Sequence, residues 1–392
     1  MAFKPLSADA DLKDAVLMST QMRRPAPPPT RPPSLVPRWR CPPDMRIVAA
    51  LLHAPAPKPC NAPLDALLAR TSWLLPDARA SIQLLPVPGH ASATLRVVRD
   101  DLLHPHIAGN KARKLDGLLP ALAAAGSTDV LTCGGLHSAH AAAVAAACAS
   151  LGLRSHILYR GEQPANGLSG HALLTTLFAT TTRFVSRDAY ADRAQLLRSA
   201  AKALQGEGVR VATIPEGAAC AGGVLGLLRA VHDWSQGALN NKRVALVVDS
   251  GTGATVWSLA LAIALLNLPW RVLAVPVGGT QKDAASRNAL LAAEWNAAHP
   301  ELAAPSALPL QWAAAPGGRF GECTPADVAA CRQLARTSGV LTDPVWTLHA
   351  YKAACELAAT SSEEEVVWVH TGGAAAALEG VAQRYGAGHF AE

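Results

Sequence analysis

The sequence predicts an α/β protein built on parallel sheets, and three observations support that fold class. Strand-like and helical stretches alternate from 130 to 214 and again from 244 to 298, which indicates βαβ units. The stretch 244–249 opens with an unbroken apolar run, which is typical of a strand buried on both faces. Glycine-rich loops follow three of the strands. The 392 residues are enough for two domains.

The individual elements follow from local sequence patterns. Apolar runs bounded by turn residues predict strands at 95–99, 130–132, 155–159, 182–186, 209–214, 244–249, 270–277 and 366–369. Longer stretches, many of them rich in alanine, predict helices at 64–70, 115–125, 138–151, 170–180, 191–204, 255–267, 282–298, 325–338 and 349–360. The stretch 300–320 carries six prolines or glycines, so we expect a surface loop there.

Composition excludes several classes of protein. Half of the residues are hydrophobic and 16% are charged, so most of the chain is expected to be packed. The net charge of +6 does not indicate a nucleic-acid surface, because seven basic residues lie between 20 and 60 beside a single acid. The eight cysteines lack metal-ligand spacing, which argues against zinc and disulfides and favours a reducing compartment. The most apolar window, 256–277, is interrupted by Asn, Pro and Arg, so no membrane span is predicted.

Residues 1–62 are predicted to be a disordered leader. The proline-rich stretch 23–33 cannot form helix or sheet. An arginine-rich segment that is poor in acids suits an organellar transit peptide, although Asp9, Asp11 and Asp14 oppose that interpretation at its start. A poly-proline recognition segment or an unprocessed tail is the alternative.

The stretch Gly-Asn-Lys-Ala-Arg-Lys at 109–114 carries the main candidate for chemistry, Lys111. We expect Asn110 to cap the next helix, which places Lys111 in its first turn. There the helix dipole, Arg113 and Lys114 all disfavour the ammonium form and lower its pKa. Such a lysine can form a Schiff base with an aldehyde such as pyridoxal phosphate. The alternative is a solvated basic face at a helix start.

Two of the glycine-rich loops offer anion sites. Loop 133–140 leads into a helix, so its backbone N–H groups and the Ser138 hydroxyl can hold a carboxylate; the alternative is a plain helix cap. Loop 249–255 joins a strand to a helix in the same way. It has neither Gly-Lys-Thr nor a clean Gly-x-Gly-x-x-Gly, which leaves a monophosphate as its ligand.

The third loop, 370–373, is considered together with 342–347 because both carry threonines. A threonine hydroxyl beside a pyridine nitrogen would keep that nitrogen neutral, whereas a carboxylate would protonate it. The alternative is a turn at Asp343 and a core aromatic at Trp346.

Seven collinear motifs resemble the pyridoxal-phosphate family of D-cysteine desulfhydrase and 1-aminocyclopropane-1-carboxylate deaminase. The resemblance covers 63–386 and is greatest to the plant-type mitochondrial desulfhydrases. The motifs lie at 98–105, 109–116, 133–145, 160–164, 249–253, 342–345 and 370–373.

This resemblance implies a fold-type-II, tryptophan-synthase-β-like protein with two three-layer α/β domains and the cofactor in the cleft between them. The large cofactor-binding domain would comprise 63–111 and 231–392, and the small domain 112–230. Lys111 and Ser138 would be catalytic, and no metal is expected. The implied cofactor-binding residues are Lys111, Asn110, Gly251, Thr252, Gly253, Ala254, Thr255, Thr347 and Thr371, and the implied substrate-binding residues are Ser138, Ala139, His140 and Trp346.

Three positions depart from patterns seen in this family. Ala139 stands where many members have an asparagine that would bond the cofactor 3-hydroxyl. Trp346 replaces a tyrosine, and an indole cannot act as a general acid or base. Thr347 replaces the glutamate of the deaminases, which favours desulfhydration.

We therefore expect α,β-elimination of D-cysteine, with L-cysteine as a further substrate, to hydrogen sulfide, pyruvate and ammonia. The alternatives are a deaminase or β-eliminase acting on 1-aminocyclopropane-1-carboxylate or D-serine, and a weakly active cofactor-binding paralogue. A small amino acid would be the substrate, with neither nucleic acid nor membrane as partner. We expect a homodimer in the mitochondrion, with chloroplast or cytoplasm as alternative compartments.

Overall fold

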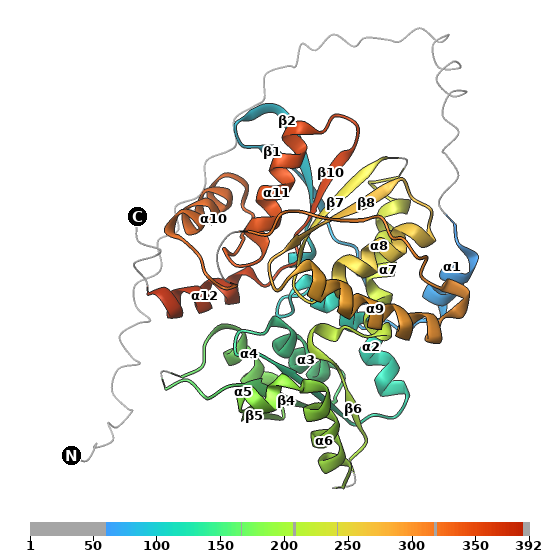
Figure 1. Cartoon of the computed structure of the whole chain (residues 1–392), viewed down its shortest axis with the longest axis vertical. Coiled ribbons are helices and arrows are strands. Elements are labelled where there is room, and N and C mark those ends of the chain that lie inside the picture. Colours follow the sequence, from blue (N-terminus) through green and yellow to red (C-terminus); the bar gives the residue numbers. More distant parts are fainter. Residues whose placement is uncertain (1–59, 166, 207–208, 241, 317–319, 387–392) are drawn as a thin grey trace, which may run out of the picture. The chain divides into compact units, whose positions relative to one another are not determined.

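A computed structural model describes residues 60–392 except 166, 207–208, 241, 317–319 and 387–392 (Figure 1). The predicted leader therefore lies outside the described residues apart from its last three, 60–62. Helix α1 (Ala62–Arg70) begins there, because the Asn61 side chain accepts a hydrogen bond from Leu64 N at 3.1 Å and caps it.

Two sheets organise the described chain (Figure 1). The larger has the strand order β1-β2-β10-β7-β8-β9 and the smaller β5-β4-β3-β6. All neighbours run parallel except β1 and β2, which form an antiparallel hairpin. The strands are β1 (Ile82–Val87), β2 (His90–Val98), β3 (Asp129–Gly134), β4 (Arg154–Arg160), β5 (Thr181–Val185), β6 (Val211–Thr213), β7 (Val244–Ser250), β8 (Trp270–Pro276), β9 (Leu310–Trp312) and β10 (Glu365–Val369).

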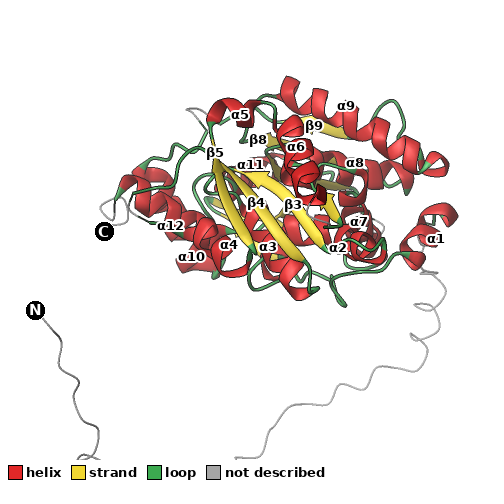
Figure 2. Cartoon of the chain, turned by 90° about the horizontal axis from the view of Figure 1, so that it is seen from below, coloured by secondary structure: helices red, strands yellow, loops and turns green. Residues whose placement is uncertain are grey.

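Helices cover both faces of each sheet, as Figure 2 shows for the small one. Apolar cores place α7, α8 and α9 on one face of the large sheet and α10 and α11 on the other. Helices α2 and α3 face the small sheet from one side, and α5 and α6 from the other. The remaining helices are α2 (Gly109–Ala124), α3 (Ala139–Ser150), α4 (Gly170–Phe178), α5 (Arg187–Ala191), α6 (Arg193–Gly206), α7 (Leu225–Gln236), α8 (Ala254–Leu265), α9 (Gln281–Ala298), α10 (Pro325–Ser338), α11 (Thr347–Thr360) and α12 (Ala374–Tyr385).

The alternating α/β pattern is confirmed, but several predicted details were wrong. Strands β1 and β9 were not predicted, and β9 lies inside the stretch expected to be a surface loop. It is a three-residue strand that pairs with β8 at the edge of the large sheet, and so short a strand has little signal in its own sequence. Helices α7 and α12 were also missed. The predicted domain boundaries at 111/112 and 230/231 fall inside α2 and α7, and the division stays a prediction.

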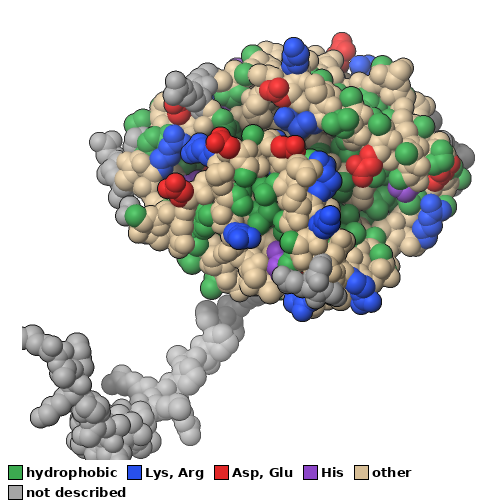
Figure 3. All heavy atoms as spheres, turned by 60° about the horizontal axis from the view of Figure 1, so that its bottom comes forward, with side chains coloured by type: hydrophobic (Ala, Val, Ile, Leu, Met, Phe, Trp, Pro, Cys, Tyr) green, Lys and Arg blue, Asp and Glu red, His purple; other side chains and the backbone are tan. Residues whose placement is uncertain are grey.

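Within the described residues, none of the helices combines the length and apolarity that crossing a membrane requires. In the same part of the chain, no group of three or more His, Cys, Asp or Glu side chains is arranged to hold a metal ion. Figure 3 shows acidic and basic side chains intermingled on the face that it presents, without a patch of one sign.

Two close contacts fix the start of α2. A Cβ on Gly109 would lie 2.2 Å from the carbonyl oxygen of Asp100, so only glycine fits there. One turn further on, Arg113 makes a two-pronged ion pair with the Asp100 carboxylate, at 2.5 and 2.6 Å. Both side chains are fully buried. Because a charge in the interior needs its partner, this pair locks α2 against the segment that follows β2.

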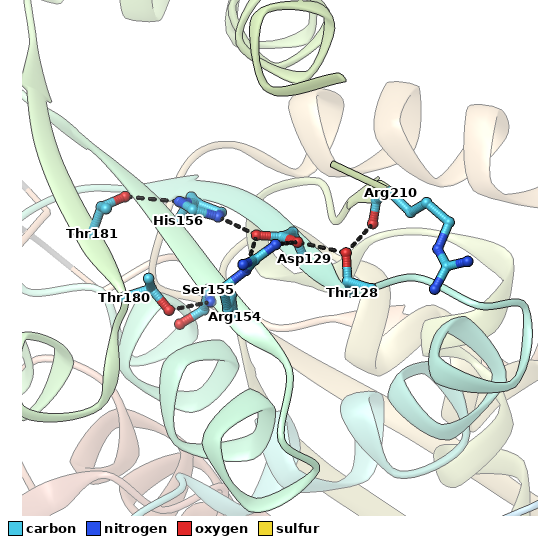
Figure 4. A network of polar contacts seen from close by, with 8 residues as sticks. All are labelled: Thr128, Asp129, Arg154, Ser155, His156, Thr180, Thr181 and Arg210. Atoms are coloured by element: carbon cyan, nitrogen blue, oxygen red, sulfur yellow. Dashed lines mark hydrogen bonds and ion pairs between the residues drawn. The ribbon is translucent and has the colours of Figure 1, made fainter. Parts of the chain in front are cut away.

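A second polar network ties together the amino-terminal ends of the small-sheet strands (Figure 4). Asp129 at the start of β3 accepts hydrogen bonds from Thr128, from Arg154 and from His156. Its side chain is 2% exposed. Burial alone would raise its pKa, but these hydrogen bonds outweigh burial and lower its pKa to about 2.

We expect Asp100→Asn to reduce the free energy of unfolding by about 3 kcal/mol, because it leaves the buried Arg113 guanidinium without its counter-charge. Urea denaturation followed by circular dichroism measures this loss. The control is Asp77→Asn, which removes an ion pair whose side chains are 79% and 59% exposed. Equal losses in the two variants would contradict the assignment.

The Asp129 network predicts a pH-dependent contribution to stability. Its folded-state pKa of about 2 lies below the ordinary value of 3.8, so its contribution is full above that value and disappears as the pH falls toward 2. The stability difference between the wild type and Asp129→Asn should therefore narrow as the pH is lowered from 6 to 3. Denaturation curves across this range test the prediction; a constant difference would refute it.

Candidate active site

Lys111 lies where α2 meets the loop after β10. Asn110 N donates a hydrogen bond to the Thr371 carbonyl oxygen at 3.1 Å. A Cβ on Gly372 would approach Gly109 N to 2.7 Å, so loop and helix start are in close contact. The Lys111 ammonium donates to Asn110 Oδ1 at 3.0 Å. The structure thus brings together three predicted cofactor residues, Asn110, Lys111 and Thr371.

The expectation that Asn110 caps α2 was wrong. The N-cap is Ala108, without a side-chain cap, and Asn110 is already inside the helix. Tertiary contacts at Gly109 and Arg113 fix the helix start, which frees the Asn110 side chain to bond Lys111 instead.

The pKa of Lys111 is lowered as predicted, but the main physical cause differs. Burial lowers it from the ordinary 10.5, and the nearby Asp249 opposes that effect. The Arg113 charge is matched by Asp100. Lys114, one turn along the same helix, is buried and its own pKa lies well below the ordinary value, through burial and through Lys111.

Two buried aspartates hold the two predicted threonine hydroxyls. Thr371 Oγ1 donates to Asp249 Oδ1 at 2.7 Å, and Thr347 Oγ1 donates to Asp343 Oδ2 at 2.7 Å. All four side chains are at most 5% exposed. Burial raises the pKa of Asp249 and Asp343 raises it further, while Thr371 and Lys111 oppose them. Neither aspartate was among the residues predicted to belong to the site.

The loop from Gly251 to Thr255 forms the start of α8. Gly253 is the N-cap with a φ of 91°, a left-handed conformation that favours glycine, and no side chain caps the helix. The Arg287 guanidinium donates to the carbonyl oxygens of Thr252 and Gly251, at 2.9 and 3.2 Å. Because Arg287 binds these two carbonyl oxygens, the loop can present its N–H groups to an anion.

Further groups beside this loop complement an anion. The buried Lys114 Nζ donates to the Gly217 carbonyl oxygen at 3.0 Å. A Cβ on Gly217 would lie 2.9 Å from Thr252 Cγ2, so the lysine reaches the wall of the loop. Ser250 Oγ is buried and has no hydrogen-bond partner among the described residues. Since Lys114 lies three positions after Lys111, helical periodicity is the signal that could have found it.

Loop 134–140 places Ser138 at the start of α3. Ser138 Oγ accepts a hydrogen bond from Ala141 N at 3.2 Å, so the serine caps the helix and its O–H stays available to donate. A Cβ on Gly134 would meet this hydroxyl at 2.6 Å. Ala139 follows as a half-buried residue. The contacts of Ser138 are within its own loop, and its catalytic role stays a prediction.

The tautomer of His140 follows from its neighbours. Thr132 gives its one O–H to the Ile214 carbonyl oxygen at 2.7 Å, so it must accept from His140 Nε2, 2.9 Å away. Burial, with Lys111 and Lys114, lowers the pKa of His140 to about 3, so the ring is neutral. Its buried Nδ1 is therefore a bare acceptor without a partner among the described residues. This nitrogen can bind a hydrogen-bond donor of a ligand but not the carboxylate of a substrate.

Trp346 lies over the glycine loop. A Cβ on Gly251 would come within 2.9 Å of two indole atoms, and one on Gly278 within 3.2 Å. The Phe320 ring packs on the indole edge to face, 5.1 Å between centroids. The predicted phosphate loop and the predicted substrate residue Trp346 are thus in direct contact.

His171 was not predicted to belong to the site. It is the second residue of α4, 7% exposed, and its Nδ1 has no partner among the described residues. A Cβ on Gly373 would lie 3.5 Å from its Nε2. Burial and Lys111 lower its pKa to about 4. Nothing in its own segment could have signalled this, because the loop it faces is about 200 residues away.

Taken together, the donor set fits a ligand that combines an aldehyde with a phosphate. Lys111 supplies an amine with a lowered pKa, and the uncapped start of α8 supplies the anion site. The buried, unpartnered Ser250 Oγ can donate to an anion, whereas the buried His140 Nδ1 is an acceptor that would need a donor group elsewhere on the ligand.

Comparisons with known proteins agree with this interpretation of the site. The chain is 34% identical over 390 residues to a protein of Oryza sativa subsp. japonica named provisionally as mitochondrial D-cysteine desulfhydrase 2, covering 83% of this chain and 95% of that one. It is 31% identical over 317 residues to D-cysteine desulfhydrase of Klebsiella pneumoniae, covering 76% and 93%.

A crystal structure of a homologue of ACC deaminase superposes with a TM-score of 0.72 at 28% identity, covering 83% of this chain and 98% of the other. The expected fold-type-II architecture is thereby confirmed. Residues 82–372 match the model of a family described as pyridoxal-phosphate dependent enzyme. This chain therefore belongs to the family of pyridoxal-phosphate dependent enzymes.

Proposed function

We propose that the chain is a lyase that eliminates hydrogen sulfide from D-cysteine, leaving pyruvate and ammonia. The observation that carries the proposal is the half-buried Lys111, with its lowered pKa, in a site whose anion loop opens α8. The names of the rice and Klebsiella relatives support the substrate. L-Cysteine is proposed as a second substrate.

In this proposal Lys111 holds the cofactor covalently, and the loop from Gly251 to Thr255 holds its phosphate with help from Lys114. Thr347 and Thr371 contact its ring, and Ser138 receives the substrate carboxylate. Bound pyridoxal phosphate draws electrons away from the α-carbon of the amino acid, so that its C–H bond can be broken.

The residues of the chain supply the proton transfers. Because the pKa of Lys111 is lowered, its amine can be neutral when released by the substrate and can take the α-proton. The electron pair left on the α-carbon forms a double bond to the β-carbon as the C–S bond breaks. The sulfur leaves as the hydrosulfide ion and takes up one proton to give hydrogen sulfide. Water then hydrolyses the remaining fragment to pyruvate and ammonia.

The weakly active paralogue is the second candidate, and Trp346 is the observation that favours it. The indole covers Gly251 and has no acid or base function. An enzyme that needs a hydroxyl at this position would bind the cofactor yet turn over slowly.

Two further properties are part of the proposal. We propose a homodimer on the strength of the family resemblance, to be tested by light scattering after gel filtration. We propose a mitochondrial location because a relative carries that designation in its name, with chloroplast and cytoplasm as alternatives. A fusion of residues 1–62 to a fluorescent protein tests the location.

We expect the cofactor-loaded chain to release sulfide and pyruvate in equal amounts from D-cysteine. Lys111→Ala should abolish both products, whereas Lys202→Ala, a change on an exposed part of α6, should leave the rate unaltered. The absence of sulfide from either enantiomer of cysteine would rule out the proposed function. Pyruvate from D-serine, or ring opening of 1-aminocyclopropane-1-carboxylate, would assign the chain to the alternative activity.

Trp346→Tyr separates the two candidates. If the chain is a desulfhydrase adapted to tryptophan, we expect this change to alter the rate by less than about tenfold, because neither the lysine nor the anion loop changes. A much larger activation, measured by sulfide release at saturating D-cysteine, would identify the wild type as the weakly active paralogue.

The lowered pKa of Lys111 predicts its reactivity. In the cofactor-free chain at pH 8, acetic anhydride should acetylate Lys111 several-fold faster than the exposed Lys202, since more of its amine is neutral. Asp249→Asn should increase the rate further, because Asp249 raises that pKa. Mass spectrometry of digests measures both rates; equal rates at every pH would contradict the lowered pKa.

A further inference from the structure

The single O–H of Thr347 is committed to Asp343. Thr347 Oγ1 donates to Asp343 Oδ2 at 2.7 Å and accepts from Asp343 N at 2.9 Å. A hydroxyl has one proton and two lone pairs, so one lone pair is all that remains for a ligand. In this arrangement the Thr347 hydroxyl can accept a hydrogen bond but cannot donate one.

The Asp343 carboxylate is fixed as an acceptor by four donors at the start of α11. Oδ1 accepts from Val345 N and Trp346 N, at 2.9 and 2.7 Å. Oδ2 accepts from Thr347 N at 3.3 Å and from the Thr347 hydroxyl. The carboxylate is 1% exposed and lies at the positive end of α11. Both oxygens of the carboxylate are thus engaged by donors, and the Thr347 hydroxyl is one of them.

We propose that Asp343 is a positioning residue, which makes the Thr347 hydroxyl an obligate acceptor and so keeps the ring nitrogen of bound pyridoxal phosphate protonated. This rests on the proposed function in one respect, the contact between Thr347 and that nitrogen. It reverses the expectation from sequence that a threonine keeps the nitrogen neutral. A hydroxyl backed by a buried carboxylate behaves toward a ligand as a weaker carboxylate does.

The consequence for the reaction is a more electron-poor ring. A protonated ring withdraws electrons more strongly from the substrate α-carbon than a neutral one. Asp343 thereby acts on the chemistry without touching the cofactor, through the orientation of one hydrogen bond.

Asp343→Asn tests the proposal with little change in shape. The amide oxygen must occupy the position of Oδ1, because Val345 N and Trp346 N both donate there. The amide NH₂ then takes the position of Oδ2 and donates to Thr347 Oγ1, which releases the threonine O–H to donate to the ring nitrogen. The hydrogen bond reverses while most of the helix cap is retained.

The measurement is ¹⁵N NMR of the holoenzyme loaded with pyridoxal phosphate labelled at the ring nitrogen, without substrate. The wild type should show a protonated nitrogen at pH 7. In Asp343→Asn the pH at which the nitrogen loses its proton should fall by at least about one unit, a tenfold change in its equilibrium constant. An unprotonated nitrogen in the wild type, or an unchanged midpoint in the variant, would overturn the proposal.

Control variants separate this role from helix capping. Asp327→Asn removes a capping carboxylate from α10 and should leave the nitrogen signal unchanged. Thr347→Ser keeps the hydroxyl and should resemble the wild type, whereas Thr347→Val should lose the proton even if Asp343→Asn fails to fold. If the ¹⁵N signal of the ring nitrogen is the same in Thr347→Val as in the wild type, the proposal is overturned. The NMR measurement is made without substrate, so it does not depend on turnover. A failure to release sulfide in the activity assay would therefore refute the proposed function and leave the role of Asp343 standing.

Discussion

The buried pair between Arg113 and Asp100 is the constraint on which the placement of Lys111 depends. Arg113 bonds both carboxylate oxygens and also reaches the Ala78 carbonyl oxygen at 3.2 Å. Its guanidinium lies over the Trp234 ring of α7, 5.2 Å from the centroid. One side chain therefore fixes α2 against both the segment after β2 and a helix of the large-sheet core. Lys111 is oriented by contacts that lie behind it, which leaves its amine free for chemistry.

Two buried aspartates likewise position side chains of the site. Asp249 is the penultimate residue of β7 and accepts a hydrogen bond from the Thr371 hydroxyl, while Asp343 precedes α11 and accepts one from the Thr347 hydroxyl. Each carboxylate determines what a neighbouring hydroxyl offers to a ligand. The polar character of the site thus depends on carboxylates that lie one hydrogen bond behind the two threonines predicted to contact the cofactor, because each carboxylate sets the direction of an O–H bond.

Sequence reasoning predicted the local arrangement of strand, glycine loop and helix at 249–255, which the structure confirms, while the phosphate-binding role of that loop stays a prediction. A strand followed by a glycine loop and a helix presents an anion site wherever it occurs, so the loop from Gly251 to Thr255 could be predicted from its own residues. The start of α2 could not, because Asn110 has the chemistry of a cap and only the contact of Gly109 with Asp100 excludes it from that position. His171 and the direction of the Thr347 hydrogen bond depend on partners that only the folded chain provides. The short β9 is specified by its pairing with β8 rather than by its composition.

The contact between Gly109 and Asp100 also determines whether residues 109–114 would keep a reactive lysine in another protein. The lowered pKa of Lys111 comes chiefly from burial, and that burial exists because the helix start is pressed against the chain segments around it. Grafted onto the exposed helix of another scaffold, the six residues 109–114 would give an ordinary lysine. A designer who wishes to transplant this reactivity must carry over Asp100, Arg113 and the loop at Thr371 as one unit.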